Sequence, residues 1–75
     1  MKLTFYKNNR IDGKHEKSVD EIIKDFNATE ESKLDMPFER LILNFMAEAY
    51  GSFDVLTDDQ WNELHKARKT NFSNN

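Results

Sequence analysis

The predicted fold depends on residues 37–50, PFERLILNFMAEAY. Their apolar side chains recur at i, i+3, i+4, i+7, i+8, i+11 and i+12, which is the spacing of one helix face. Leu43 widens this face to roughly 200° of arc, about twice the width usual for a surface helix. We therefore expect a central helix over residues 36–50, with the rest of the chain packed around it. The apolar face comprises Phe38, Leu41, Ile42, Phe45, Met46, Ala49 and Tyr50.

The residues around this stretch carry signals for both ends of the helix. We expect Asp35 to be its N-cap, with Pro37 in the first turn, where a missing N–H costs little. Gly51 follows Tyr50 at the position where helices commonly end in a left-handed residue.

Two further helices are predicted from capping boxes, in which a side-chain oxygen satisfies a free N–H of the first turn. Ser18 and Glu21 open a helix over residues 18–27, whose apolar positions follow the helical period. Thr57 and Gln60 open a helix over residues 58–69, whose apolar stripe fails after Leu64. We expect the polar tail, residues 70–75, to be frayed.

The N-terminal residues favour β structure. Residues 2–6, KLTFY, alternate apolar and polar side chains, as a half-buried strand does. The pairs Asn8-Asn9 and Asp12-Gly13 both tolerate the backbone of a tight turn. We expect a return strand around residues 10–15, with Ile11 pointing inward.

The sequence thus predicts one α+β domain over residues 1–75, in which a strand or hairpin (1–17) packs on three helices. The alternative is an all-α three-helix bundle with an irregular N-terminus. With about twenty large apolar residues and no cysteine, the stability margin is thin. The expected core comprises Leu3, Phe5, Val19, Ile22, Ile23, Phe26, Phe38, Leu41, Ile42, Phe45, Met46, Ala49, Phe53, Leu56, Trp61 and Leu64.

Charge is distributed unevenly along the chain. Residues 1–17 carry a net charge of +3, residues 18–63 carry −9, and residues 64–75 carry +3. The sequence shows neither a signal peptide nor an apolar run long enough to span a membrane, so we expect a soluble, cytoplasmic protein. Frequent Asn and Lys with few Gly and Pro suggest an AT-rich genome, such as that of a low-GC bacterium or its phage.

No pattern in the sequence indicates an enzyme. There is no cysteine, and no metal-ligand spacing of the two-His helix type or the calcium-loop type occurs. His65 follows Trp61 by one helical turn, so we expect it to shield the indole ring. Asp58 and Asp59 are explained by the dipole of the helix that they open. We therefore expect no catalytic residue, cofactor or metal.

The favoured interpretation is a non-catalytic protein-interaction module, such as a phage or mobile-element protein that inhibits a host nucleic-acid-processing protein. Its acidic residues would occupy a basic groove of the partner, and its N-terminal strand could extend a partner's sheet. Self-association is a further option for so small a core. The expected partner-binding residues are Glu30, Glu31, Asp35, Asp58, Asp59 and Glu63.

The alternative is a small nucleic-acid-binding regulator. Its basic ends would form one phosphate-binding patch if the hairpin packed beside the end of the last helix. Against this, cations in a last helical turn are already favoured by the helix dipole. The residues of this patch would be Arg10, Lys14, Lys17, Lys66, Arg68 and Lys69.

Overall fold

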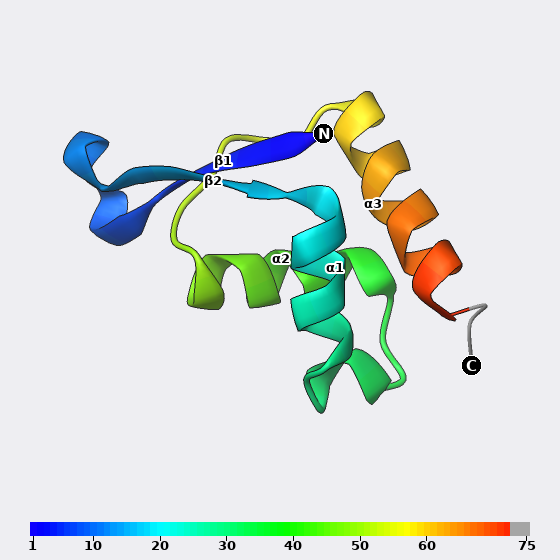
Figure 1. The fold of residues 1–75 in the computed structure, drawn as a ribbon. Helices are drawn as coiled ribbons and strands as arrows, with labels where there is room; N and C mark the ends of the chain where they lie inside the picture. The colour runs from blue at the N-terminus through cyan, green and yellow to red at the C-terminus, as the bar shows by residue number, and fades with distance from the viewer. Residues whose placement is uncertain (73–75) are drawn as a thin grey trace.

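The computed structural model describes residues 1–72, which form an antiparallel hairpin followed by three helices (Figure 1). This confirms the predicted α+β class, and the all-α alternative is wrong. The elements are β1 (Lys2–Tyr6), β2 (Lys14–Ser18), α1 (Val19–Asn27), α2 (Phe38–Ala49) and α3 (Asp58–Phe72), with short 3-10 turns at Lys7–Asn9, Ile11–Gly13 and Glu31–Lys33.

The turn of the hairpin is longer than the sequence indicated. Strand β1 forms as predicted, but the return strand is Lys14–Ser18, because two 3-10 turns occupy residues 7–13. Asn8 and Asn9 adopt positive φ angles of 58° and 59°, as the turn signal predicted. Gly13 is needed for a different reason: a Cβ there would lie 2.6 Å from the Lys7 carbonyl oxygen.

One face of the hairpin packs on the helices. In the register of the ladder, Leu3 pairs with Lys17 and Phe5 with His15, so these four side chains share the inner face. Leu3 and Phe5 are fully buried, as predicted. Ile11 is not inward-pointing: it lies in the turn between the strands and is 87% exposed. The prediction for Ile11 was wrong because the loop is longer than the assumed turn.

Helix α1 begins as its capping box predicted. The Ser18 hydroxyl accepts a hydrogen bond from the Glu21 N–H at 3.1 Å. Glu21 does not reach back to Ser18; its carboxylate accepts a hydrogen bond from the Lys17 ammonium at 3.3 Å. The four apolar residues of α1 are all buried, and α1 contacts both other helices and β2. Helix α1 therefore lies between the other elements.

Helix α2 covers Phe38–Ala49, slightly less than the predicted residues 36–50, and its N-terminal cap differs from the prediction. Pro37 is the residue before the helix, its carbonyl accepts the first helical hydrogen bonds, and Asp35 does not cap. At the other end, Gly51 has φ = 112°, as predicted. Ala49 is exposed instead of buried, and Leu43 is 36% exposed, so the buried face is narrower than the apolar pattern suggested.

Helix α3 opens on a reciprocal capping box. The Gln60 N–H donates to Thr57 Oγ1 at 3.1 Å, and the Thr57 N–H donates to Gln60 Oε1 at 2.8 Å. The helix continues to Phe72, so the predicted end at residue 69 was too early; residues 73–75 lie outside the described part of the chain. Ala67 is buried, so the buried face of α3 continues one turn beyond Leu64.

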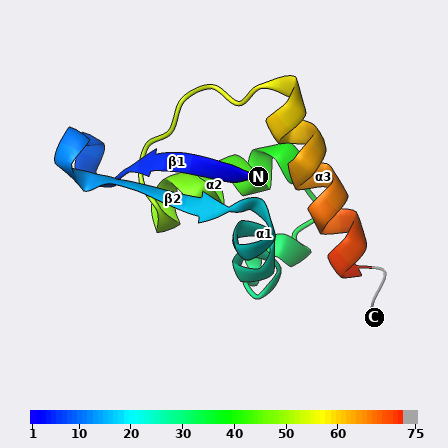
Figure 2. The same cartoon turned by 45° about the horizontal axis from the view of Figure 1, so that its top comes forward.

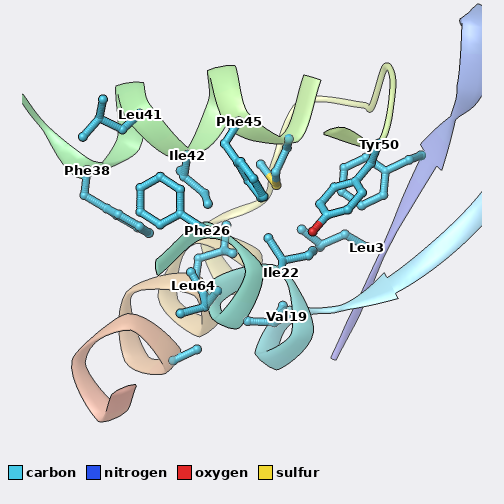
Figure 3. Packing of buried hydrophobic residues seen from close by; sticks show 14 residues of the cluster. Leu3, Val19, Ile22, Phe26, Phe38, Leu41, Ile42, Phe45, Tyr50 and Leu64 are labelled. Carbon is cyan, nitrogen blue, oxygen red and sulfur yellow. The ribbon is translucent and has the colours of Figure 1, made fainter. Parts of the chain in front are cut away.

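The core lies where α1, α2, α3 and the hairpin meet (Figure 3). Phe26 of α1 packs edge-on against Phe38 and Phe45 of α2, with ring centroids 5.7 and 5.6 Å apart. Phe53, Leu56 and Trp61 are only partly buried, whereas the sequence placed them in the core. The buried apolar residues are Leu3, Phe5, Val19, Ile22, Ile23, Phe26, Phe38, Leu41, Ile42, Phe45, Met46, Tyr50, Leu64 and Ala67.

The hairpin extends to one side of the helices (Figures 1 and 2). Its turn, residues 7–13, lies at one end of the 39 × 23 × 17 Å molecule, and α3 lies at the other. No helix within residues 1–72 has the length and apolar character needed to cross a membrane.

Candidate interaction surfaces

The predicted acidic residues do not form one surface. Glu30, Glu31 and Asp35 lie in the segment between α1 and α2, whereas Asp58, Asp59 and Glu63 lie on the N-terminal half of α3 (Figure 1). Helix α3 begins beside the N-terminal end of α1, whereas the segment between α1 and α2 follows the C-terminal end of α1 (Figure 1). The two acidic groups therefore lie at opposite ends of α1. The fold therefore divides the acidic set in two.

The predicted basic patch is also divided. Arg10, Lys14 and Lys17 belong to the hairpin, and Lys66, Arg68 and Lys69 belong to the C-terminal half of α3, at the far end of the molecule (Figure 2). The hairpin does not pack beside that end of α3, which was the condition for a combined patch. That arrangement was wrong.

Three of these six cations already have intramolecular partners. Lys17 pairs with Glu21 and lies 5.3 Å from the centre of the Tyr50 ring. Arg10 Nε donates to Asp12 at 3.1 Å. The Arg68 guanidinium lies 4.6 Å from the centre of the Phe38 ring, which it helps to cover. Only part of the predicted set is thus presented to solvent without a structural role.

Both histidines contribute to packing. The His15 ring lies over Phe5, with centroids 5.9 Å apart, and its Nδ1 is 3.3 Å from the Gly13 carbonyl oxygen. The His65 ring lies 6.2 Å from Trp61, as the sequence suggested, and its Nε2 is 3.1 Å from a Glu39 carboxylate oxygen. Sequence reasoning missed this contact between α3 and α2, because no local pattern joins residues 26 positions apart.

A second contact missed from the sequence joins Tyr50 to Asp25. The Tyr50 hydroxyl donates to Asp25 Oδ2 at 2.9 Å, linking the end of α2 to α1. Burial, followed by this hydrogen bond and the charges of Asp25 and Glu21, raises the pKa of Tyr50 well above its ordinary value. The pair is therefore a partly buried structural link between the two helices, in which Tyr50 is buried and Asp25 is exposed. Within the described residues, no three His, Asp or Glu side chains come together to hold a metal ion.

The turn of the hairpin, residues 7–13, is the surface with the clearest signs of a contact site, and we call it the hairpin tip. It carries an apolar side chain, Ile11, that is 87% exposed. Lys7, Arg10 and the adjacent Lys14 are the cations in and beside this turn, and Arg10 is paired with Asp12. Below the tip, a cleft of about 610 Å³ separates it from the end of α2.

In comparisons with known proteins, the chain matches no family model, no curated protein and no solved structure. The surfaces described above therefore have to be interpreted from their own chemistry.

Proposed function

We propose that this chain is a small, non-catalytic protein-interaction module that docks on its partner through the hairpin tip. The observation that carries the proposal is Ile11, which is 87% exposed on a projecting, ordered turn. A single exposed apolar residue is common on protein surfaces. Here it is combined with a hydrogen-bonded backbone and with the nearby cations Lys7 and Lys14, and this combination favours a contact residue.

The backbone of the hairpin tip is fixed before any partner binds. The Arg10 N–H donates to the Lys7 carbonyl at 3.2 Å, and the Gly13 N–H donates to the Arg10 carbonyl at 3.0 Å. The Lys14 N–H donates to the Ile11 carbonyl, closing the second turn. An ordered loop loses little conformational entropy on binding, which is the usual advantage of a preorganised contact element.

The chemistry of the tip defines the surface that it fits. Burial of an isoleucine side chain contributes roughly 1.5–3 kcal/mol, and the nearby cations favour an acidic rim. We therefore expect the partner to offer an apolar pocket bordered by Asp or Glu. The partner class expected from the sequence, a host nucleic-acid-processing protein bound by a phage or mobile-element protein, was argued from the acidic residues. It stays a proposal, and the proposed contact moves from those residues to the hairpin tip.

Strand addition is less well supported than docking through the tip. Tyr6 of β1 already pairs with Ser52, and the free edge of β2 is short. The Lys14 N–H on that edge already donates to the Ile11 carbonyl. The exposed charged side chains of Lys14 and Glu16 also discourage pairing of this edge with another strand. Extension of a partner's sheet by the hairpin is therefore not part of the proposal.

Affinity capture with matched variants tests the proposal. Wild-type chain, Ile11→Asp and Leu34→Asp are immobilised and exposed to a lysate of the natural host. Leu34 is a suitable control because it is also an exposed apolar residue, 53% exposed, but lies between α1 and α2. We expect Ile11→Asp to reduce recovery of the specific partner by about tenfold or more, and Leu34→Asp to leave it unchanged.

Equal recovery with all three baits would contradict docking through Ile11. The nucleic-acid alternative is separated by titrating labelled random duplex DNA at low and moderate salt. Binding that weakens steeply with salt and is lost in a Lys66→Ala, Lys69→Ala variant would favour that alternative. Arg68 is left intact in this variant because it covers Phe38.

A further inference from the structure

Within the described residues, the backbone of the segment between α2 and α3 pairs with β1 through one isolated bridge. Tyr6 and Ser52 form an antiparallel bridge, in which the Tyr6 N–H donates to the Ser52 carbonyl at 2.8 Å and the Ser52 N–H donates to the Tyr6 carbonyl at 3.1 Å. A residue pair that exchanges both bonds fixes the register of everything beyond it.

This register assigns a partner on β1 to each following residue. Phe53 falls opposite Phe5, and their rings are in contact, with centroids 5.6 Å apart. Continuing the same ladder would place Asp54 opposite Thr4 as a hydrogen-bonded pair. It would then place Val55 opposite Leu3, on the inner face of the sheet.

The ladder is interrupted after Phe53. Val55 is 95% exposed, and a cleft of about 250 Å³ separates residues 53–57 from the first residues of β1. Within the described residues, no backbone hydrogen bond joins Lys2 or Thr4 to this segment. In an antiparallel strand the backbone groups of Lys2 and Thr4 point to the same side as those of Tyr6, and so toward the segment.

One end of the segment is already in place for a longer ladder, and the other end lines the same cleft as the start of β1. Ser52 is fixed opposite Tyr6, and Leu56, Thr57 and Lys2 all line the same cleft. Paired strands have nearly the same rise per residue, about 3.4 Å. Residues 52–56 equal residues 2–6 in number, so a continued ladder would end with Leu56 opposite Lys2. Figure 2 shows the segment running separately from β1 between these two ends.

We propose that residues 52–56 are a strap that closes onto β1 as the third strand of the sheet. In the closed state, Thr4 and Asp54 exchange backbone hydrogen bonds, and Val55 leaves solvent to pack beside Leu3. In the open state described above, the backbone edge of β1 at Lys2 and Thr4 and the partly buried side chains of Phe53 and Leu56 are accessible, whereas the side chain of Leu3 is already buried. The strap thus controls access to this edge, independently of the hairpin tip.

Amide hydrogen exchange tests the strap through two proline variants. In the closed ladder the Asp54 N–H points toward β1 and the Val55 N–H points away. Asp54→Pro therefore blocks closure, whereas Val55→Pro leaves the ladder bonds intact. We expect the Thr4 amide of the wild-type chain to exchange about tenfold more slowly than in Asp54→Pro, and Val55→Pro to retain most of this protection.

Equal exchange rates for Thr4 in the wild-type chain and Asp54→Pro would overturn the proposal. If Asp54→Pro does not fold, the wild-type chain alone decides the question. Closure brings the Hα atoms of Leu3 and Val55 together as a non-hydrogen-bonded pair, so a nuclear Overhauser effect between them supports the strap, and its absence refutes it.

Discussion

Replacement of Ile42 by alanine tests the packing of this fold most severely. Ile42 lies in the middle of α2, and its side chain is fully buried between α1 and α2 (Figure 3). The substitution removes the three side-chain carbons beyond Cβ. Burial of each contributes about 0.8 kcal/mol to stability, or about 2.4 kcal/mol together. The cavity left behind raises the expected loss to about 3–4 kcal/mol. A chain of this length has roughly 4–11 kcal/mol of stability in total.

Urea unfolding followed by the fluorescence of Trp61, the single tryptophan, provides the assay. With a slope of about 1 kcal/mol per molar urea for so small a protein, the midpoint should fall by about 3 M. If Ile42→Ala is unfolded without urea, Ile42→Val keeps the test quantitative, with an expected loss of about 0.5–1.5 kcal/mol.

Leu43→Ala is the matched control, because Leu43 is the next residue in α2 and is 36% exposed. We expect it to lose less than about 1 kcal/mol. Equal losses for Ile42→Ala and Leu43→Ala would refute the packing described above, and so would a midpoint shift below about 1 M for Ile42→Ala.

Three further predictions follow from local contacts. The pKa of the Tyr50 hydroxyl is raised in the folded state, so as pH rises the unfolded chain loses the hydroxyl proton before the folded chain does. The free energy of unfolding should therefore fall as pH rises above about 10. Tyr50→Phe should remove that part of the pH dependence in urea titrations. Gly51→Ala should cost more than about 1 kcal/mol, because φ is 112° and the new Cβ would lie 2.6 Å from the Tyr6 carbonyl oxygen; a thermal melt would measure the loss. Ser18→Ala should lower the free energy of unfolding by about 1 kcal/mol. It should also speed hydrogen exchange at the Glu21 amide, because that N–H donates a hydrogen bond to the Ser18 hydroxyl.

The parts of the fold that were predicted correctly depend on short-range signals. Ser18, Thr57 and Gly51 act as the local patterns indicated, because a cap involves residues within one turn of each other. The strand at residues 2–6 was predicted from its alternation. Ile11 was placed wrongly because a single apolar residue cannot fix a register, and the length of the loop determines where the return strand begins.

The parts that could not be predicted depend on how the elements are arranged in space. The apolar pattern of α2 does not say which side a neighbour covers, and Leu43 and Ala49 are left exposed. The contacts of Tyr50 with Asp25 and of His65 with Glu39 join distant residues. For the same reason the acidic and basic sets looked continuous in the sequence and are divided in the structure.

Site-specific photocrosslinking tests the proposed function most directly. A photoreactive amino acid replaces Ile11 in one chain and Leu34 in another, and each is irradiated in a lysate of the natural host. If the hairpin tip is the contact, position 11 gives one dominant adduct with a protein whose crosslinked site has an apolar pocket and an acidic rim, and position 34 does not give it. The same adduct from both positions, or none from position 11, would contradict docking through the tip.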